Sequence, residues 1–560
     1  MKELDLIYVS YNSEKWIKQC FDSITKSDYD LNKISIYVVD NASKDNSLEV
    51  LYQCKDKLEK VVKKFEIISP KKNLGFGKGN NLGFKAGNSP IVCFFNIDTE
   101  LYPNTLSELV KDIEQSDKKF GLWELRQFPY EHPKIYDALT HETVWSSGAA
   151  FAMYRQLYEE INGFDERFFM YCEDVDLSWR VRCLGYSLKY VPKAVINHYA
   201  YQSAGEIKPN QYLYSIINNL MLRYRFGTFH DITTGHKLIL KQLSIPGTFK
   251  NARKKLLIKY LLSFFNALHF LKHKSKYTNL KPLFLGFDYA AIRDGAFYVN
   301  HFPENKPLVS IIVRTCGRPD VLRETLISLR LQTYSNIEVV IVEDGKNKSE
   351  KMIKEEFSDL NIIYKATQEK VGRSKAGNIA MNLAHGKYLN FLDDDDLFYA
   401  DHVEVLVAAI EEKSEKAVYA FGFCTPIEVL SKSPYKYKLI DYLGLIKQDY
   451  NKLMLFHHNY IPIECLMFEK SLFLDYGGFD ESLDALEDWD LFVRFSLHTD
   501  FLCIPKTTSI YRVPANNDLN VSRQKMLDNA LLLVREKHKS YKNILSAYDF
   551  AQLYEDIHKL

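Results

Sequence analysis

Pairs of acidic residues that could act as general bases occur twice in this chain, once in each half. Glu173-Asp174 follows a Gly-Phe-Asp-Glu sequence at residues 163–166, and Glu487-Asp488 follows the same sequence at residues 478–481. An acid that begins a helix after such a turn can project into a crevice and deprotonate an acceptor hydroxyl group, a step that contributes about 10²–10⁴ to a rate. We therefore predict catalytic carboxylates at both pairs.

Other acids in the same two segments have a simpler, structural explanation. Asp176 lies four residues before Arg180, and Asp490 lies four residues before Arg494. Side chains at this spacing share one face of a helix, where opposite charges attract. We expect both to be helix-stabilising ion pairs. Capping of a helix N-terminus is the corresponding alternative for the Glu-Asp pairs themselves.

A second acidic position lies upstream in each half, directly after an apolar run. Residues 91–98 end at Asp98, and residues 388–396 end in four consecutive aspartates. Hard oxygen ligands suit Mg²⁺ or Mn²⁺, and a cation held by one or two carboxylates keeps positions open for substrate phosphates. Such a cation can neutralise a departing diphosphate, which suits a nucleotide-sugar donor. A solvated turn is the alternative, but its duplication with matching downstream motifs disfavours it.

Short apolar strands are expected to position these acids. In each half a first strand (residues 6–10 and 309–315) is followed by a second that ends in an acid (residues 36–40 and 339–344), and amphipathic helical stretches alternate with them. This alternation predicts an α/β fold with a doubly wound, mainly parallel sheet. Ligands bind beyond the carboxyl ends of the strands in such sheets. Because the whole order recurs, the repeat unit is a domain.

Together these segments resemble the inverting family 2 glycosyltransferases, which have the GT-A fold. In the first half, Val9-Ser10-Tyr11-Asn12, residues 38–45 and residues 73–81 resemble rhamnosyltransferases that act on bacterial surface polysaccharides. The second half resembles the family more generally. The resemblance covers most of the chain. It implies two GT-A domains, which are Rossmann-like nucleotide-diphospho-sugar transferase domains of the α/β class, joined by a helical linker.

The resemblance implies a role for each matching residue of the first half. The donor-binding residues would be Tyr11, Asn12, Asp40, Asn41, Gly75, Lys78 and Asn96. The metal ligands would be Asp98 and His198. Asp174 would be the base, with Glu173 beside it. Asn96 replaces the first acid of the family's metal motif, so the metal dependence of this half stays open.

The matching residues of the second half carry corresponding implied roles. The donor-binding residues would be Thr315, Glu343, Asp344, Arg373 and Asp394. The metal ligands would be Asp393 and Asp395, and Asp488 would be the base, with Glu487 beside it. Tyr511-Arg512 stands where the family often has a late histidine.

Glycine-rich segments at residues 75–79 and 372–377 precede a helical stretch in each half. As a bare pattern, the first could be a dinucleotide-binding loop or a flexible turn. It lacks the close strand-turn-helix placement and the later ribose-binding acid of a Rossmann site, and it fits a glycosyltransferase donor loop better.

The segment from Ile232 to Phe287 has no acidic residue and a local charge of about +11, which can attract an anionic surface. Its cationic residues are Lys237, Lys241, Lys250, Arg253, Lys254, Lys255, Lys259, Lys272, Lys274, Lys276 and Lys281. Interleaved apolar residues at helical spacing predict amphipathic helices that could lie on an anionic membrane. The alternatives are a solvated helical bridge between the domains and, less favoured, a nucleic-acid contact.

The overall composition favours a globular enzyme. The 560 residues include 73 basic and 72 acidic side chains, a balance that argues against a dedicated nucleic-acid binder. The nine cysteines are scattered without a CxxC pair, as expected of reduced thiols in cytoplasm. We expect neither a signal peptide nor a membrane-spanning segment, since no apolar run approaches about 18 residues.

These observations predict a bifunctional enzyme. The expected divisions are GT-A domains at 1–230 and 301–530, a basic helical linker at 231–300 and a helical segment at 531–560. The resemblance implies a dTDP-rhamnose-like donor for the first domain and a UDP-hexose or UDP-N-acetylhexosamine donor for the second. The acceptor would be a polyprenyl-diphosphate-linked glycan of a capsule or O-antigen, at the inner face of the cytoplasmic membrane. Two alternatives are an alternating copolymerase and a chain with one non-catalytic carbohydrate-binding or scaffold domain.

Overall fold

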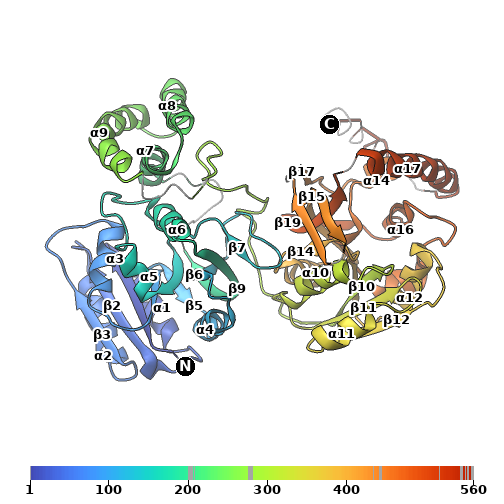
Figure 1. Cartoon of the computed structure of the whole chain (residues 1–560), viewed down its shortest axis with the longest axis horizontal. Coiled ribbons are helices and arrows are strands. Elements are labelled where there is room, and N and C mark those ends of the chain that lie inside the picture. The colour runs from blue at the N-terminus through green and yellow to red at the C-terminus, as the bar shows by residue number, and fades with distance from the viewer. Residues whose placement is uncertain are drawn as a thin grey trace. The chain divides into compact units, whose positions relative to one another are not determined.

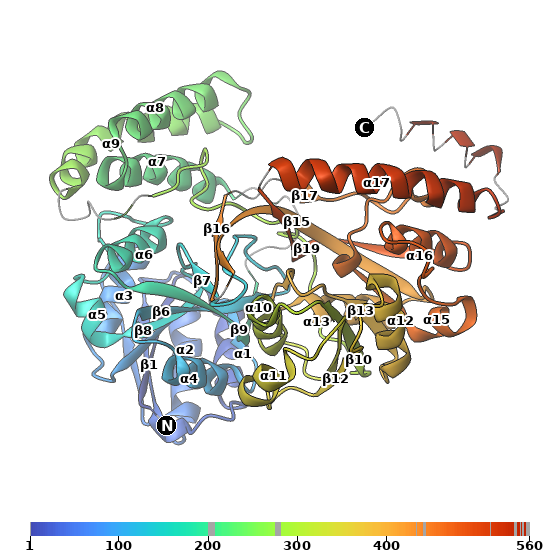
Figure 2. The same ribbon diagram turned by 45° about the vertical axis from the view of Figure 1, so that its right-hand side comes forward.

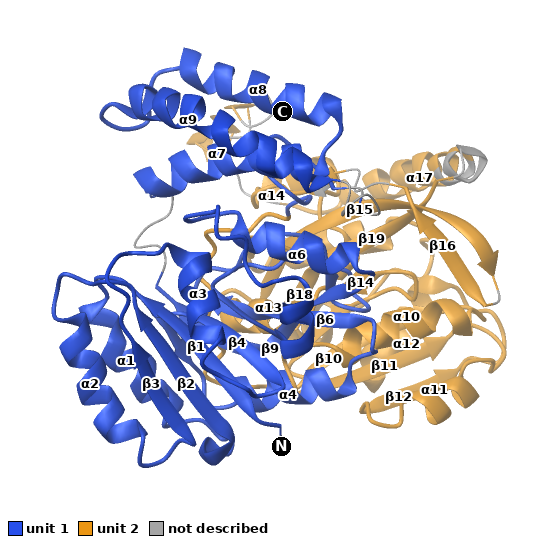
Figure 3. Ribbon diagram, turned by 60° about the vertical axis from the view of Figure 1, so that its left-hand side comes forward, with its two compact units in different colours: residues 1–292 blue, residues 293–560 orange. Residues whose placement is uncertain are grey.

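A computed structural model describes most of the chain and divides it into two compact units. The described residues are 2–199, 206, 208–274, 280, 282–432, 434–440, 444–515, 517–542, 546–548, 550–551 and 554–555. Contacts divide the chain between Ile292 and Arg293 (Figure 3). The sequence-based boundaries at 230, 300 and 530 stay predictions.

Unit 1, residues 1–292, is built on a mixed sheet with the strand order β3-β2-β1-β4-β8-β6-β9-β5, and β7 pairs with β9. The strands are β1 (Leu4–Ser10), β2 (Ile34–Asp40), β3 (Lys64–Ile68), β4 (Ile91–Asn96), β5 (Thr99–Leu101), β6 (Phe120–Phe128), β7 (Glu142–Thr143), β8 (Ala150–Tyr154) and β9 (Ser187–His198). β3, β2, β1 and β4 run parallel, whereas β8 runs antiparallel to β4. The sheet is therefore less uniformly parallel than the sequence pattern indicates.

Helices cover both faces of this sheet, which explains why β1 and β2 consist almost entirely of buried residues. The helices are α1 (Glu14–Ile24), α2 (Ser47–Leu58), α3 (Phe76–Phe84), α4 (Thr105–Gln115), α5 (Arg155–Glu160), α6 (Glu173–Cys183), α7 (Pro209–Phe226), α8 (Phe229–Ser244) and α9 (Ala252–Lys272). Figure 1 shows α7, α8 and α9 as an outer layer, with α6 between them and the sheet. An apolar cluster joins Trp179 of α6 to Leu220 of α7 and Phe270 of α9. The basic segment thus packs on unit 1.

Unit 2, residues 293–560, repeats the strand order as β12-β11-β10-β13-β18-β15-β19-β14, with β16 and β17 paired to β15. The strands are β10 (Val309–Thr315), β11 (Ile337–Glu343), β12 (Ile362–Ala366), β13 (Tyr388–Phe391), β14 (Leu397–Phe398), β15 (Ala417–Lys432), β16 (Tyr435–Leu439), β17 (Gly444–Ile446), β18 (Leu466–Glu469) and β19 (Phe501–Pro514). β18 runs antiparallel to β13, as β8 does to β4. The two halves therefore share one α/β architecture.

The helices of unit 2 are also arranged like those of unit 1. They are α10 (Pro319–Arg330), α11 (Glu350–Glu356), α12 (Arg373–Leu383), α13 (His402–Glu411), α14 (Lys452–His457), α15 (Lys470–Tyr476), α16 (Glu487–Ser496) and α17 (Asn517–His538). Figure 2 shows α16 between α17 and the sheet, the place that α6 takes beneath α7 in unit 1. Across the described residues of both units, no helix combines the length and apolar character needed to cross a membrane.

Strand pairing brings the predicted site residues to one edge of each sheet. Ser10 pairs with Asp40 and Val9 pairs with Asn96 in unit 1, while Thr315 pairs with Glu343 in unit 2. Carboxyl ends of parallel strands meet at one edge, so donor-binding and metal-type residues converge there.

Candidate active sites

Each Glu-Asp pair begins a helix in a strained backbone setting. The residue before the pair, Cys172 in unit 1 and Leu486 in unit 2, has a left-handed conformation with φ of 68° and 58°. Such conformations are uncommon outside glycine and cluster at functional sites. The same conformation at the same position gives the following acids the same setting in both units.

The two aspartates have matching hydrogen bonds. Asp174 accepts from the backbone N–H of Gly148 and Val175, each at 2.8 Å. Asp488 accepts from the backbone N–H of Trp489 at 2.8 Å and from the side-chain amide of Asn459 at 3.1 Å. Burial raises the pKa of both carboxyls, that of Asp488 to about 7. A carboxylate with a raised pKa is a stronger base, so each aspartate is suited to accept a proton.

The neighbouring glutamates differ between the units. Glu173 is buried, and its Oε2 has no hydrogen-bond partner among the described residues. Burial raises its pKa well above the ordinary range. Glu487 accepts instead from Nη1 of Arg314 at 2.8 Å. In unit 2 the glutamate therefore has a cationic partner within the protein. In unit 1 the described residues provide no cation that binds Glu173.

A shared network supports both Gly-Phe-Asp turns. Asn81 of α3 binds both the N–H and the C=O of Phe164, at 3.0 and 2.9 Å. Asn378 of α12 binds both groups of Phe479 in the same way, at 2.8 and 3.0 Å. Sequence analysis did not single out these asparagines. Their common position, six residues after Gly75 and Gly372, is the signal that would have found them.

The predicted helix ion pairs are confirmed, and each has a further partner. Asp176 lies 2.8 Å from Arg180, and Asp490 lies 3.0 Å from Arg494. Asp176 also contacts Arg225 of α7. Asp490 correspondingly lies 2.8 Å from Lys537 of α17. These contacts fix α6 to α7 in unit 1 and α16 to α17 in unit 2.

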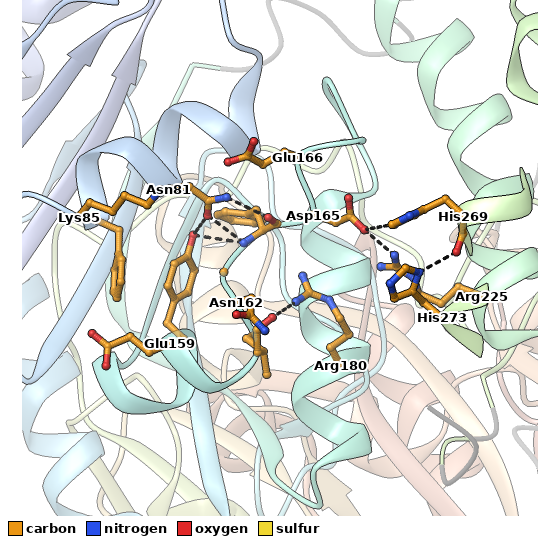
Figure 4. A pocket seen from close by; sticks show the side chains of 15 residues that line it. Asn81, Lys85, Glu159, Asn162, Asp165, Glu166, Arg180, Arg225, His269 and His273 are labelled. Carbon is orange, nitrogen blue, oxygen red and sulfur yellow. Dashed lines mark hydrogen bonds and ion pairs between the residues drawn. The ribbon is translucent and has the colours of Figure 1, made fainter. Parts of the chain in front are cut away.

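A pocket of about 550 Å³ borders the turn of unit 1 (Figure 4). Asp165 lies at its centre and binds Arg225 and, at 3.4 Å, Nε2 of His269. Helix α9 is thereby connected to the turn that precedes the Glu-Asp pair.

Donor-side residues of unit 1 surround the ends of β1 and β2. Asp40 is buried, and its Oδ1 lacks a hydrogen-bond partner among the described residues. Tyr11 is 43% exposed, and Asn12 accepts from the N–H of Lys44 at 2.8 Å. Asn41 donates to the carbonyl of Gly75 at 3.1 Å. Tyr11 directly follows Ser10, the residue that pairs with Asp40, so an exposed aromatic ring and a carboxylate oxygen lie at the same strand ends, which suits the predicted nucleoside-binding role.

Asn96, Asp98 and His198 converge at the ends of β4 and β9. Nε2 of His198 lies 3.6 Å from Oδ1 of Asp98 and 3.4 Å from Nδ2 of Asn96. Nδ1 of His198 lies 2.6 Å from Oε1 of Gln127, an acceptor, so Nδ1 carries the proton and Nε2 keeps its lone pair. The donor set therefore fits a divalent cation. Lys78, by contrast, forms an ion pair with Glu166 at 2.6 Å.

Arginines engage the acidic run of unit 2. Nε and Nη2 of Arg314 bind the two oxygens of Asp393, each at 2.8 Å. Arg318 contacts Asp394 and lies 3.1 Å from Asp395. Of the two predicted metal ligands, Asp395 is the more exposed, at 38% of its side chain against 27% for Asp393, and both oxygens of Asp393 are bound by Arg314. Asp395 therefore fits a cation better than Asp393 does.

Several acids of unit 2 lie close enough to raise one another's pKa, since, besides burial, Asp393 and Asp488 raise the pKa of Glu464. Glu464 is fully buried, and burial raises its pKa to about 8. Burial also raises the pKa of Asp394 to about 7. Neither Arg314 nor Glu464 was predicted from the sequence, although a lone charge inside an apolar run marks both. A bound cation would relieve this crowding, which again suits a divalent metal.

The other predicted residues of unit 2 lie at the same edge. Thr315 donates to Asp394 at 2.6 Å. Asp344 accepts from the N–H of Val371 and Gly372, as Asn41 binds the glycine-rich segment of unit 1. Arg373 lies 4.0 Å from Glu487. Glu343 accepts from its own loop, at 3.0 Å from the N–H of Lys348, so its carboxylate is already bound.

Three features indicate an α/β glycosyltransferase of the GT-A type. They are the repeated sheet, the polar and acidic residues at the ends of its parallel strands, and the Glu-Asp pairs. The family model for glycosyl transferase family 2 matches residues 5–177 and 310–473. The chain belongs to glycosyl transferase family 2.

Relatives with known sequences carry the same description. An uncharacterized glycosyltransferase of Rickettsia prowazekii is 31% identical over 190 residues, 34% of this chain and 58% of the relative. Another of Methanocaldococcus jannaschii is 29% identical over 250 residues, 42% of this chain and 82% of the relative. The chain thus spans little more than half of the Rickettsia protein.

Solved structures also align with about half of the chain. A mannosyltransferase of Pyrobaculum calidifontis, in complex with GDP-Man and Mn²⁺, is 17% identical with a TM-score of 0.34, and the match covers 49% of this chain and 73% of that one. TarS of S. aureus is 16% identical with a TM-score of 0.35, and the match covers 49% and 54%.

Proposed function

We propose that the chain is a bifunctional, inverting glycosyltransferase in which each unit transfers one sugar from a nucleotide-diphosphate donor. The observation that carries this proposal is the repeated setting of Asp174 and Asp488. Each lies in the first turn of a helix, two residues after a left-handed residue, and accepts a hydrogen bond from the next backbone N–H. Two active sites would be expected to keep this geometry, since a binding module has no use for a base.

The aspartate of each unit would remove the proton of the acceptor hydroxyl. The hydroxyl oxygen would then form a bond to the anomeric carbon while the bond to the diphosphate breaks on the opposite face, which inverts the configuration. A carboxylate base suffices when attack and departure are concerted. The raised pKa of each aspartate supports this assignment.

A divalent cation, Mg²⁺ or Mn²⁺, would be held by Asp98 and His198 in unit 1 and by Asp395 in unit 2. Among the described residues, no three or more His, Cys, Asp or Glu side chains are grouped to hold a metal. The remaining ligands would therefore come from the donor's phosphates and water. When bound, the cation would neutralise the departing diphosphate.

The donors would be a dTDP-rhamnose-like sugar in unit 1 and a UDP-hexose or UDP-N-acetylhexosamine in unit 2. The motifs of residues 9–12 and 73–81 support the first assignment. The acceptor would be a growing capsule or O-antigen glycan on a polyprenyl diphosphate, at the inner face of a bacterial cytoplasmic membrane. The basic residues of α9 support an acidic lipid-linked acceptor.

A panel of nucleotide sugars with Mg²⁺ or Mn²⁺ would test the proposal on the wild type, Asp174→Asn and Asp488→Asn. We expect two donors, each losing about 10²–10⁴ of its turnover in a different variant. A single donor that depends on one aspartate would favour the alternative in which the other unit only binds carbohydrate. Wild-type turnover in either variant would remove that residue as the base.

A further inference from the structure

Helix α9 exposes apolar side chains on the side away from the protein. Its buried residues are Ala252, Leu256, Ser263, Ala267 and Phe270. Its exposed apolar residues are Leu257, Ile258, Leu261, Leu262, Phe264, Phe265, Leu268 and Leu271. Phe265 is 81% exposed and Leu268 is 74% exposed. This set is called the outer face of α9 below.

The outer face lies opposite the buried one. At about 3.6 residues per turn, Leu261, Phe265 and Leu268 fall on the side of the helix directly away from Leu256 and Phe270. A helix on the surface of a globular protein normally carries polar residues there. Figures 1 and 3 show α9 in the outer helical layer, beyond α7 as seen from the sheet. An exposed apolar surface of this extent marks an interaction site.

Positive charge borders the outer face at both ends. Arg253, Lys254 and Lys255 are exposed in the first turn and Lys272 is exposed in the last. No acid occurs between Ile232 and Phe287, although Lys276 and Lys281 of that segment lie outside the described residues. Apolar side chains bordered by cations are the pattern of a helix that lies in a bilayer interface.

We propose that the outer face of α9 docks unit 1 on the surface of an anionic lipid bilayer. The charge selects this occupant, because a second copy of the chain would bring a like-charged face against the first. The apolar side chains would enter the acyl boundary while the lysines contact acidic headgroups. This inference stands on the surface alone and does not depend on the proposed donors.

Docking would hold the catalytic helix of unit 1 near the membrane. Helix α9 contacts the Gly-Phe-Asp turn through His269 and Asp165, and Arg225 connects Asp165 to Asp176 of α6 (Figure 4). An acceptor carried on a lipid would then be presented to the site from the same surface.

Flotation of the full chain with vesicles tests the inference. We expect the wild type to bind vesicles of phosphatidylcholine with phosphatidylglycerol. The double variant Phe265→Ser/Leu268→Ser should bind them at least about tenfold more weakly. The matched control is Leu474→Ser, an equally exposed leucine of unit 2 at 68%, which should bind like the wild type. Undiminished binding of the double variant would overturn the proposal, as would a wild-type chain that does not float with these vesicles.

Two further experiments test the role of charge and the alternative of self-association. Lys254→Glu/Lys255→Glu should lose binding to the anionic vesicles, and added salt should weaken wild-type binding. Light scattering after gel filtration reports the oligomeric state. A wild-type dimer that Phe265→Ser/Leu268→Ser converts to monomer, without any vesicle binding, would overturn the proposal in favour of a second copy. Circular dichroism of each variant confirms that it is folded.

Discussion

At the scale of residues, the two sites solve the same electrostatic problem differently. Glu487 has Arg314 beside it, whereas the equivalent position of unit 1 is Val9, and Glu173 keeps an unpartnered buried oxygen. A buried carboxyl without a cation favours its protonated form. Burial therefore raises the pKa of Glu173 and favours its protonated form, although the adjacent aspartates of the two units have matching hydrogen bonds.

The pKa of Asp488 predicts how transfer by unit 2 depends on pH. Burial, and then the charge of Glu487, raise this pKa to about 7, while Arg314 and Arg373 lower it. A base must be unprotonated, so activity falls as the pH drops below that value, by about tenfold for each pH unit. Measuring kcat/KM in the Asp174→Asn variant isolates unit 2. A flat profile through the acidic range would contradict the assignment of Asp488.

Arg314 predicts a loss specific to unit 2. Arg314→Met removes the cation from Glu487, which is buried, and from Asp393, which is partly buried. Removing one partner of a buried ion pair typically costs about 3–5 kcal/mol of stability. We expect lower thermal stability and loss of unit 2 transfer, with unit 1 transfer retained.

Arg323→Met is the matched control for Arg314→Met. Arg323 also binds two acids, Asp320 and Glu356, but it lies at the surface with a third of its side chain exposed. Surface ion pairs contribute about 0–1 kcal/mol, so this variant should behave like the wild type. Equal effects of the two substitutions would remove the special role of Arg314.

Sequence reasoning found the residues whose partners are close in the chain or whose order recurs. The Glu-Asp pairs and the helix pairs of Asp176 and Asp490 belong to this class. Arg314 was missed because its partners, Asp393 and Glu487, lie 79 and 173 residues away. The folded sheet and α16 bring these two acids into contact with Arg314. The spacing of residues along the chain does not predict these contacts.

At the scale of elements, glycine begins the donor-side helix of each unit in a conformation that other residues avoid. Gly75 precedes α3 with φ of 84° and ψ of 178°, and Gly372 precedes α12 with φ of 92° and ψ of 155°. This region is essentially restricted to glycine. The two positions differ in the room available for a side chain. A Cβ at Gly75 would lie 2.4 Å from the carbonyl oxygen of Phe169, whereas a Cβ at Gly372 would have no atom within 4 Å.

The difference predicts unequal effects of one substitution. Gly372→Ala should destabilise the chain by about 1–3 kcal/mol through backbone strain alone. Gly75→Ala adds a collision with backbone and should cost about 1–3 kcal/mol more. Chemical denaturation of both variants measures the free energies of unfolding. If Gly75→Ala were the milder change, the close approach of Phe169 would be wrong.

The elements that sequence reasoning predicted best are the central strands. β1, β2 and β10 are mostly apolar and buried along almost their whole length, because helices cover both of their faces. The direction of β8 and β18 was not predicted, since an apolar run of five or four residues looks the same in either direction. Their antiparallel pairing makes each sheet mixed.

At the scale of the whole molecule, the repeat extends beyond the sheets. A cation of each long helix binds the third acid of the helix beneath it: Arg225 of α7 binds Asp176 of α6, and Lys537 of α17 binds Asp490 of α16. Among the residues that the structure describes, helices α8 and α9, with their basic residues, follow the long helix of unit 1 and have no counterpart in unit 2. The two units therefore share one architecture and differ in the helices that follow it.

Product length is the property of the whole chain that separates two single additions from alternating polymerisation. With both donors and a short acceptor, the wild type should add one sugar of each kind. A mixture of Asp174→Asn and Asp488→Asn chains should form the same product, because each variant keeps one working site and the intermediate can pass between chains. Mass spectrometry of the glycan measures this, and the double variant is the blank. A ladder of many alternating sugars from the wild type would favour the copolymerase instead.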